Sequence, residues 1–320
     1  VKKEIDQRIV QAYFHDPVPQ VWEMKTNNWP AVCAACAGGV VLYLEEDSER
    51  LAGMIWRVLQ SLKNFLSGFD AEGATPEGIA YWQYGFGFYV YFSELLKERT
   101  GGSIDLLRGH HLNKIAHFPE ACLLSGDRVV NFSDAPDGVE LSLGLFVRLN
   151  EIFADTIVPE GEVMINSMAR CWVTFSRNVL WSSFLEKHVE NFRRKDELVQ
   201  QQNDYYFQGH QWVISKRQNG KNFAAFAAKG GCNEEPHNHN DLGHFILHVG
   251  GNTVLMDLGA GLYTRQYFQP TSRYEQWTAG SQGHSVPVVE GITQGYGKAY
   301  QAEVIHYSND LAQVRFILDL

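Results

Sequence analysis

Five consecutive polar side chains, His237-Asn238-His239-Asn240-Asp241, stand directly before an apolar, β-prone run. Two of them are histidines two positions apart, and residues i and i+2 of an extended chain point to the same face. Two imidazoles on one face can bind a metal ion, or one of them can act as a base beside the metal. The alternative is a polar loop at a strand start whose histidines are only hydrogen-bonded, and for an isolated pair that alternative is the commoner one.

Two further side chains of metal-binding type follow along the chain. Asp257 ends the next apolar run, and His284 lies in the segment Gly283-His284-Ser285-Val286-Pro287. Two imidazoles and one carboxylate form a nitrogen and oxygen ligand set that suits zinc. The sequence therefore points to a zinc site made from separate segments.

Strand pairing does not by itself assemble this ligand set. If Gly250-Gly251-Asn252 closes a tight hairpin, Asp257 pairs opposite a residue near Phe245. His244 is then the closer neighbour of Asp257, and simple pairing does not bring His239 to it. The spacing alone therefore leaves the metal site open.

Apolar spacing predicts mostly helix over the first 200 residues. Glycine- and aspartate-rich loops, such as residues 68–73 and 125–128, separate the candidate helices. Serial helices with such loops between them fit an α/α array or toroid. The candidate helices cover residues 28–44, 51–66, 79–96, 141–153 and 179–192.

The pattern changes near residue 203, where short β-prone runs alternate with turn pairs such as Asn219-Gly220. We therefore predict a multidomain chain, α and then β, with a helical domain over residues 1–200 and an antiparallel β domain over residues 201–320. The charged stretch 186–197 is predicted to be the last helix and a connector. The β-prone runs cover residues 212–215, 223–226, 245–249, 253–256 and 316–318.

Composition argues against some classes of protein. The formal net charge is -10 and no basic run is present, which argues against a nucleic-acid binder and requires any positive site to be local. No stretch is apolar enough for membrane insertion, and no signal-peptide pattern follows Val1, so the compartment stays open between periplasmic or secreted and cytoplasmic. Cys33 and Cys36 form a CxxC pair without a second pair, which favours one buried helix face over a zinc site.

Several short motifs, each weak alone, become specific when they are taken together. In the second half they are Pro236-His237-Asn238-His239-Asn240-Asp241-Leu242-Gly243-His244-Phe245, Asp257-Leu258-Gly259-Ala260-Gly261-Leu262-Tyr263, Arg273-Tyr274 and Gly283-His284-Ser285-Val286-Pro287. In the helical half they are Asn27-Asn28-Trp29 and Glu77-Gly78-Ile79-Ala80-Tyr81-Trp82-Gln83-Tyr84-Gly85. Spread over nearly the whole chain, they resemble the heparinase II/III-like family.

The resemblance implies an incomplete (α/α) toroid followed by an antiparallel β-sandwich. Many members of the family are lyases that cleave uronate-containing polysaccharides by β-elimination, so the expected partner is an acidic polysaccharide or oligosaccharide. One zinc ion of structural role is implied, with His239, Asp257 and His284 as its ligands. Catalytic roles in a cleft between the domains are implied for Tyr81, His237 and Asn28.

Substrate binding is assigned to six further residues: Glu77, Tyr84, Trp29, Asn240, Arg217 and Arg273. The sequence departs from the family pattern at one of them. Some alginate-type lyases of the group have His immediately after the Asn that contacts the substrate carboxylate, and Trp29 stands there in this chain. The exact subfamily and substrate are therefore left open.

Structural alternatives stand beside these roles. Tyr81 and Tyr84 could be core aromatics of a helix, and Asn28 could be a helix N-cap. Glu77 suits a helix start, where a carboxylate complements the dipole. Arg217 and Arg273 could bind carboxylates or form structural ion pairs.

Two other functions also fit the sequence. A glycoside hydrolase on the same scaffold needs two carboxylates, for which Glu77 with Asp70 or Asp241 is available. A non-catalytic glycan-binding protein that keeps the fold and the zinc is the other, and Trp29 is its best support. A homodimer is compatible with the sequence.

Overall fold

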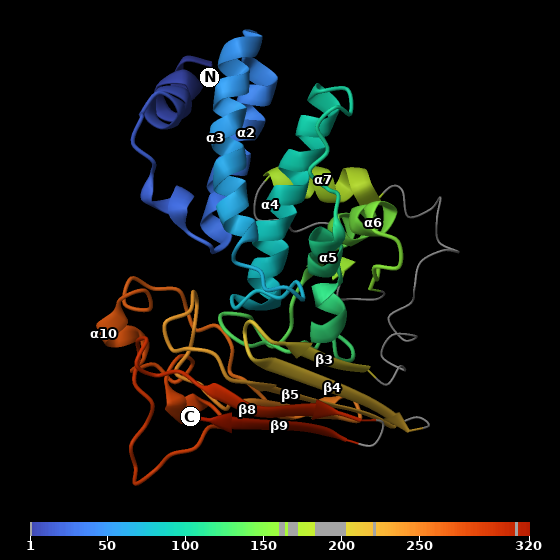
Figure 1. The fold of residues 1–320 in the computed structure, drawn as a ribbon, viewed down its shortest axis with the longest axis vertical. Helices are drawn as coiled ribbons and strands as arrows, with labels where there is room; N and C mark the ends of the chain where they lie inside the picture. The colour runs from blue at the N-terminus through green and yellow to red at the C-terminus, as the bar shows by residue number, and fades with distance from the viewer. Residues whose placement is uncertain (1, 160–163, 166–171, 183–202, 220–221, 311–312) are drawn as a thin grey trace. The chain divides into compact units, whose positions relative to one another are not determined.

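The computed structural model describes residues 2–159, 164–165, 172–182, 203–219, 222–310 and 313–320 (Figure 1). The chain forms two compact units, Val1–Phe69 with Tyr81–His110 and Asp70–Ala80 with His111–Leu320. The predicted domain boundary near residue 200 and the predicted helix over residues 186–197 lie outside the described residues.

The first unit is helical. The predicted helix over residues 28–44 is confirmed as α2, and the predicted helix over residues 51–66 is α3, which begins three residues earlier. It begins there because the Asp47 carboxylate accepts hydrogen bonds from the first backbone N–H groups of that helix. The elements are α1 (Lys2–Ile5), η1 (Asp6–Phe14), η2 (Val21–Met24), α2 (Asn28–Leu44), α3 (Ser48–Leu66) and α4 (Gly78–Arg99).

Small residues allow these helices to approach closely. A Cβ added at Gly38 of α2 would lie 2.6 Å from the Phe92 ring of α4 and 3.1 Å from Val58 of α3. The CxxC pair lies on α2, but the prediction of one buried face is wrong for Cys36, which is exposed. The neighbouring Ala34 and Ala35 are buried.

The second unit contains α5 (His110–Cys122), α6 (Leu143–Ile152) and α7 (Trp172–Ser182). The sequence did not predict α5, whose polar first turn and internal Pro119 weaken the helical pattern. The predicted helix over residues 141–153 opens instead with a short strand, β1 (Leu141–Ser142), paired in parallel with β2 (Met164–Ile165). The predicted helix over residues 179–192 begins earlier, as α7, and its part beyond Ser182 lies outside the described residues.

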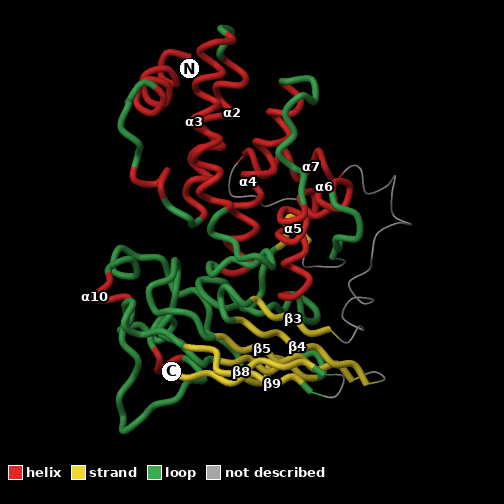
Figure 2. The backbone as a smooth tube through the Cα atoms, viewed as in Figure 1, coloured by secondary structure: helices red, strands yellow, loops and turns green. Residues whose placement is uncertain are grey.

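The second half of this unit forms a five-stranded antiparallel sheet, with the strand order β3-β4-β5-β6-β7, and a separate hairpin, β8-β9. The strands are β3 (Asn203–Phe207), β4 (Trp212–Asn219), β5 (Asn222–Lys229), β6 (Phe245–Val249), β7 (Asn252–Leu255), β8 (Glu303–Asn309) and β9 (Val314–Asp319). Figure 2 shows this change from helix to strand along the chain. A helical part followed by antiparallel sheets is therefore confirmed; the incomplete toroid and the β-sandwich stay predictions.

The two faces of the sheet have different neighbours. On one face Trp212, Ile214 and Lys216 are buried, and Lys216 Nζ donates to the carbonyls of Glu120 and Leu123 at the end of α5. The alternate side chains of β4 line a groove of about 540 Å³ that β9 also borders. Tyr206 and Tyr307 stack at 4.0 Å between the sheet and the hairpin.

None of the described helices combines the length and the hydropathy needed to span a bilayer.

Candidate functional site: a buried histidine–aspartate cluster

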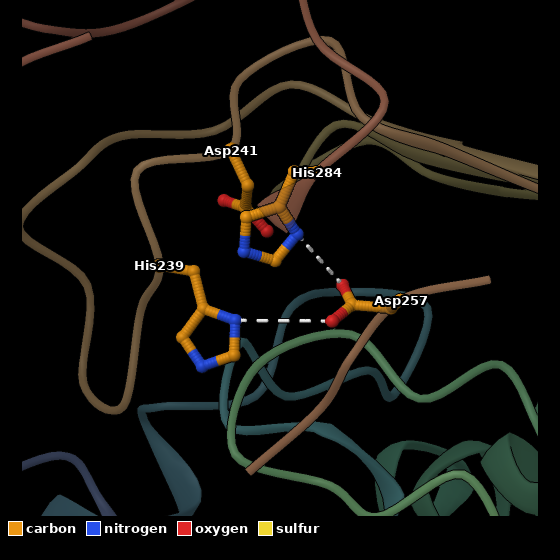
Figure 3. A group of neighbouring side chains, drawn as sticks. All are labelled: His239, Asp241, Asp257 and His284. Atoms are coloured by element: carbon orange, nitrogen blue, oxygen red, sulfur yellow. Dashed lines mark ion pairs between the residues drawn. The ribbon is translucent and has the colours of Figure 1, made fainter. Parts of the chain in front are cut away.

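Four side chains of the second unit gather their ligand atoms within 4.8 Å of one another: His239, Asp241, Asp257 and His284 (Figure 3). The Asp257 carboxylate faces both imidazoles. Its Oδ1 is 3.9 Å from His239 Nδ1, and its Oδ2 is 3.5 Å from His284 Nδ1. The three predicted zinc ligands are thus brought together, although they lie on three separate segments.

The cluster fits a metal ion because its polar atoms are buried and face one another. His239 and Asp257 are fully buried. Within the described part of the chain, His239 Nδ1, Asp257 Oδ2 and both ring nitrogens of His284 lack a hydrogen-bond partner. Buried polar atoms are normally paired, and a divalent cation would satisfy one ligand atom each of His239, Asp257 and His284. The set of imidazole and carboxylate donors suits zinc among the common metals.

The charge on Asp257 is favoured by its surroundings. Burial alone raises the pKa of this carboxyl, but its interactions with His244 and His284 outweigh burial and hold the pKa well below the ordinary value. An ionised carboxylate at the centre of the cluster is the form that binds a metal.

The hairpin predicted from the sequence, with His244 as the close neighbour of Asp257, is confirmed. Leu247 pairs with Leu255, so Asp257 falls opposite Phe245, and His244 Nε2 lies 3.2 Å from Asp257 Oδ2. His244 Nδ1 accepts from the backbone N–H of Ser285, which places the ring proton on Nε2, toward Asp257.

Hydrogen bonds between loops bring His239 and His284 together, which the pairing of β6 with β7 does not do. The backbone N–H of Asn240 donates to Ala279, and the Ser281 hydroxyl donates to the Asn240 carbonyl. These bonds tie the segment of His239 to the segment of His284, which explains why both rings reach Asp257.

Asp241 is the member of the cluster that the sequence did not assign to a metal. Both of its carboxylate oxygens accept from Lys229 Nζ, at 2.8 and 3.0 Å, and both side chains are almost fully buried. The buried ammonium neutralises the carboxylate. Asp241 therefore borders the cluster as half of an ion pair, which makes it a less available ligand than Asp257.

A further carboxylate, Asp134, was not predicted from the sequence. It accepts from His237 Nδ1 at 2.8 Å, from His239 Nε2 at 3.0 Å and from Arg273 Nη2 at 2.9 Å, and the Tyr267 hydroxyl also donates to it. Burial alone raises the pKa of Asp134, but the two histidines and Arg273 hold it well below the ordinary value.

His237 lies at the edge of this network. Its Nε2 is 3.5 Å from Glu77 Oε1, and Glu77 is buried directly before α4. The backbone of His237 has a φ of 59°, in the left-handed region that few non-glycine residues adopt. Such strain is often found at functional positions.

The predicted substrate-binding arginines are both engaged by carboxylates. Arg217 donates to the two oxygens of Asp204 at 2.6 and 3.0 Å, and Arg273 bonds to Asp134 and to the Asn238 carbonyl. Both arginines thus form the structural ion pairs that were the alternative to substrate binding. Asn240 is buried and donates to the Gln294 carbonyl. The substrate-binding roles of these three residues stay predictions.

The remaining predicted residues belong to the first unit. The helix N-cap is Asn27, whose side chain accepts from the Trp29 N–H, so Asn28 is not the cap but a buried residue of the first turn. A Cβ added at Gly85 would lie 3.1 Å from Asn28 Cβ. Tyr81 is four residues before Gly85 on the same face of α4. Tyr84 and Trp29 are exposed.

Comparison with known proteins gives a fold and no family. No protein-family model matches the chain, and no curated protein matches it in sequence. Among solved structures, 21 chains match. One is a heparinase III, the BT4657 gene product, with a TM-score of 0.61 and 12% identity over 91% of this chain. This chain spans 40% of the length of that protein. The fold is therefore similar to that of heparinase III.

Proposed function

We propose that this chain belongs to a polysaccharide lyase that cleaves a uronate-containing polysaccharide or oligosaccharide by β-elimination. The observation that carries the proposal is the placement of His237 beside a buried histidine–aspartate cluster in a fold similar to that of heparinase III. The name of that protein supports the class of reaction and of substrate. The roles of individual residues rest on the motifs.

β-Elimination removes the C5 proton of a uronate and expels the oxygen on C4. The C5 proton is weakly acidic, so the negative charge of the neighbouring carboxylate must first be reduced. The Asn28 amide and the His237 imidazole in its protonated form can donate hydrogen bonds to that carboxylate and stabilise the enolate as it develops. Tyr81 then takes the C5 proton, which requires nearby positive charge to lower its pKa from about 10.

The proton is returned to the leaving oxygen by Tyr81 or by His237, which completes the elimination. When bound, a zinc ion held by His239, Asp257 and His284 would supply a fixed positive charge that holds the loops of the cluster together. Glu77 contacts His237 and orients its ring or a sugar hydroxyl.

An ultraviolet assay tests the reaction. The protein is incubated with alginate, heparan sulfate, hyaluronan and chondroitin, and absorbance of the conjugated double bond is followed. We expect it to rise with at least one substrate. Reducing ends without this absorbance would indicate a hydrolase, and binding without either product would indicate a glycan-binding protein; both results contradict the proposal.

Substitutions test the residue roles. Tyr81→Phe and His237→Ala should each lower kcat by about 10² or more, because each removes a proton-transfer or charge-stabilising group. Tyr43→Phe is the matched control, since Tyr43 is exposed on α2. A Tyr81→Phe variant with unchanged kcat contradicts the assignment of the base.

Trp29→His should change the relative rates on the four substrates with little effect on folding, because Trp29 is 55% exposed.

A further inference from the structure

The segment Asn131–Ala135 holds several separate parts of the second unit together. The Ser133 hydroxyl donates to the Pro76 carbonyl at 2.6 Å, and Asn131 Nδ2 donates to the Asp257 carbonyl at 3.1 Å. The Ala260 N–H donates to the Ala135 carbonyl at 3.2 Å. Asp134 projects from the middle of this segment, so its carboxylate is placed by bonds on both sides of it in the chain.

The carboxylate of Asp134 receives hydrogen bonds from two histidines at once. Oδ2 accepts from His237 Nδ1, and Oδ1 accepts from His239 Nε2. An ionised carboxylate is an acceptor only, so each of these ring nitrogens must carry a proton. In a neutral imidazole the other nitrogen is then the acceptor. For His239 that atom is Nδ1, the one that faces Asp257.

We infer that Asp134 is a positioning residue for both histidines. It orients His239 so that the unprotonated Nδ1 faces the metal position. It orients His237 so that Nε2 points away from the Asp134 carboxylate. One side chain thereby couples the metal ligand to His237. The part that concerns His239 stands on the buried cluster alone. The part that concerns His237 in catalysis rests on the proposed function.

The backbone supports this role. Ser133, directly before Asp134, has a φ of 65°, and His237 has a φ of 59°. Asp134 therefore directly follows a residue in the left-handed region and His237 is itself in that region, a conformation that non-glycine residues keep only where surrounding contacts hold it. The Ser133 hydroxyl bond to Pro76 is such a contact.

Two further donors fill the remaining acceptor capacity of the Asp134 carboxylate. Arg273 Nη2 and the Tyr267 hydroxyl donate to Oδ1, and the guanidinium lies 4.3 Å from the centre of the Tyr267 ring. Arg273 also bonds to the carbonyl of Asn238, between the two histidines. This arrangement resembles the carboxylate–histidine–metal triads in which an outer carboxylate sets the tautomer of a ligand.

Asp134→Asn tests the inference, because the amide keeps the shape of the carboxylate but replaces one acceptor by a donor. Zinc affinity is measured by competition with a chelator, and cobalt(II) absorption reports the geometry of the bound metal. We expect zinc affinity to fall about 10- to 100-fold and the cobalt spectrum to change. Asp137→Asn is the matched control: it lies three residues further on and pairs with Arg128 outside the cluster.

Nitrogen-15 NMR of the histidine rings in the parent protein is a second measurement that needs no variant. We expect a proton on Nδ1 of His237 and on Nε2 of His239; the opposite tautomers overturn the inference even if Asp134→Asn fails to fold. A folded Asp134→Asn protein with lower thermal stability, but with unchanged zinc affinity and ring tautomers, also overturns it. That result would show that Asp134 has only a structural role.

A third readout separates this inference from the proposed function. If the protein is a lyase, Asp134→Asn should lower kcat by about 10-fold or more and change KM by less than about threefold, because His237 loses its orientation while the substrate contacts remain. The zinc and NMR measurements require no lyase activity. A protein that lacks lyase activity but shows the expected metal and ring results refutes the proposed function and keeps the role of Asp134 at His239.

Discussion

Around Asp134 and Asp257, charged and polar side chains from separate loops of the second unit contact one another, whereas Asn28 and Tyr81 in the first unit lie on helices packed through small and apolar residues. In the polar region, Lys229 and Asp241 are buried and pair with each other, and the buried His239 contacts the Asp134 carboxylate. In the helical region, Gly38 and Gly85 make room for neighbouring rings.

The two regions should respond differently to amino-acid substitutions. A buried charge that loses its partner keeps the full cost of its desolvation, so the polar region is sensitive to the loss of one group. A packed helix pair is sensitive to added volume and tolerates changes of charge on its exposed face. Substitutions can separate these two kinds of dependence.

The largest effect is expected for Lys229→Met. The change leaves the Asp241 carboxylate buried without its ammonium partner, which should lower the free energy of unfolding by about 3–5 kcal/mol. Urea unfolding of the metal-free protein measures it. The double variant Lys229→Met with Asp241→Leu removes both charges and should recover most of the loss. An equal loss in the double variant would show that packing, and not charge, is responsible.

Removal of zinc should have the next largest effect. An ion bound at a free concentration 100-fold above its Kd stabilises the folded protein by about 2.7 kcal/mol, so a chelator should lower the unfolding temperature of the second unit. His284→Ala should abolish this response. An unfolding temperature that does not depend on zinc, in a protein that contains none when purified, would contradict the metal site.

Gly85→Ala tests the helical region. The added methyl group would lie 2.9 Å from the Phe65 ring and 3.1 Å from Asn28 Cβ, so overpacking should cost about 1–3 kcal/mol despite the higher helix propensity of alanine. Gly53→Ala in α3 is the matched control, because nothing lies within 4 Å of the added atom; it should stabilise by about 0.5–1 kcal/mol. Equal effects of the two changes in urea unfolding would contradict the close approach at Gly85.

The smallest effect is expected for Glu235→Gln at the edge of the polar region. Burial, reinforced by Asp241 and opposed by Lys229, raises the pKa of Glu235 to about 7 from an ordinary 4.5. A raised carboxyl pKa contributes stability that is complete below pH 4.5 and is lost as the pH rises through about 7. The variant should therefore equal the parent near pH 4.5 and have a higher unfolding free energy than the parent at pH 8. The same difference at both pH values would exclude ionisation as the cause.

Local patterns predicted the elements best where neighbouring residues decide the structure. The bounds of α2 and β6 agree with the predicted runs 28–44 and 245–249, because apolar spacing and turn residues act over a few positions. The pairing of β6 with β7 followed from one hairpin and correctly placed His244 beside Asp257. The helix α5 and the strands β3 and β8 were not predicted, since their runs are short or mixed with polar residues.

The sequence by itself determined the types of side chain in the candidate site: imidazoles at His237, His239 and His284 and a carboxylate at Asp257. Only the tertiary structure decided that Asp134 contacts His237 from 103 residues away and that Lys229 neutralises Asp241. No spacing rule predicts such contacts, because the loops that make them are placed by packing over the whole unit. The physical requirement that every buried charge has a partner then selects which distant residues meet.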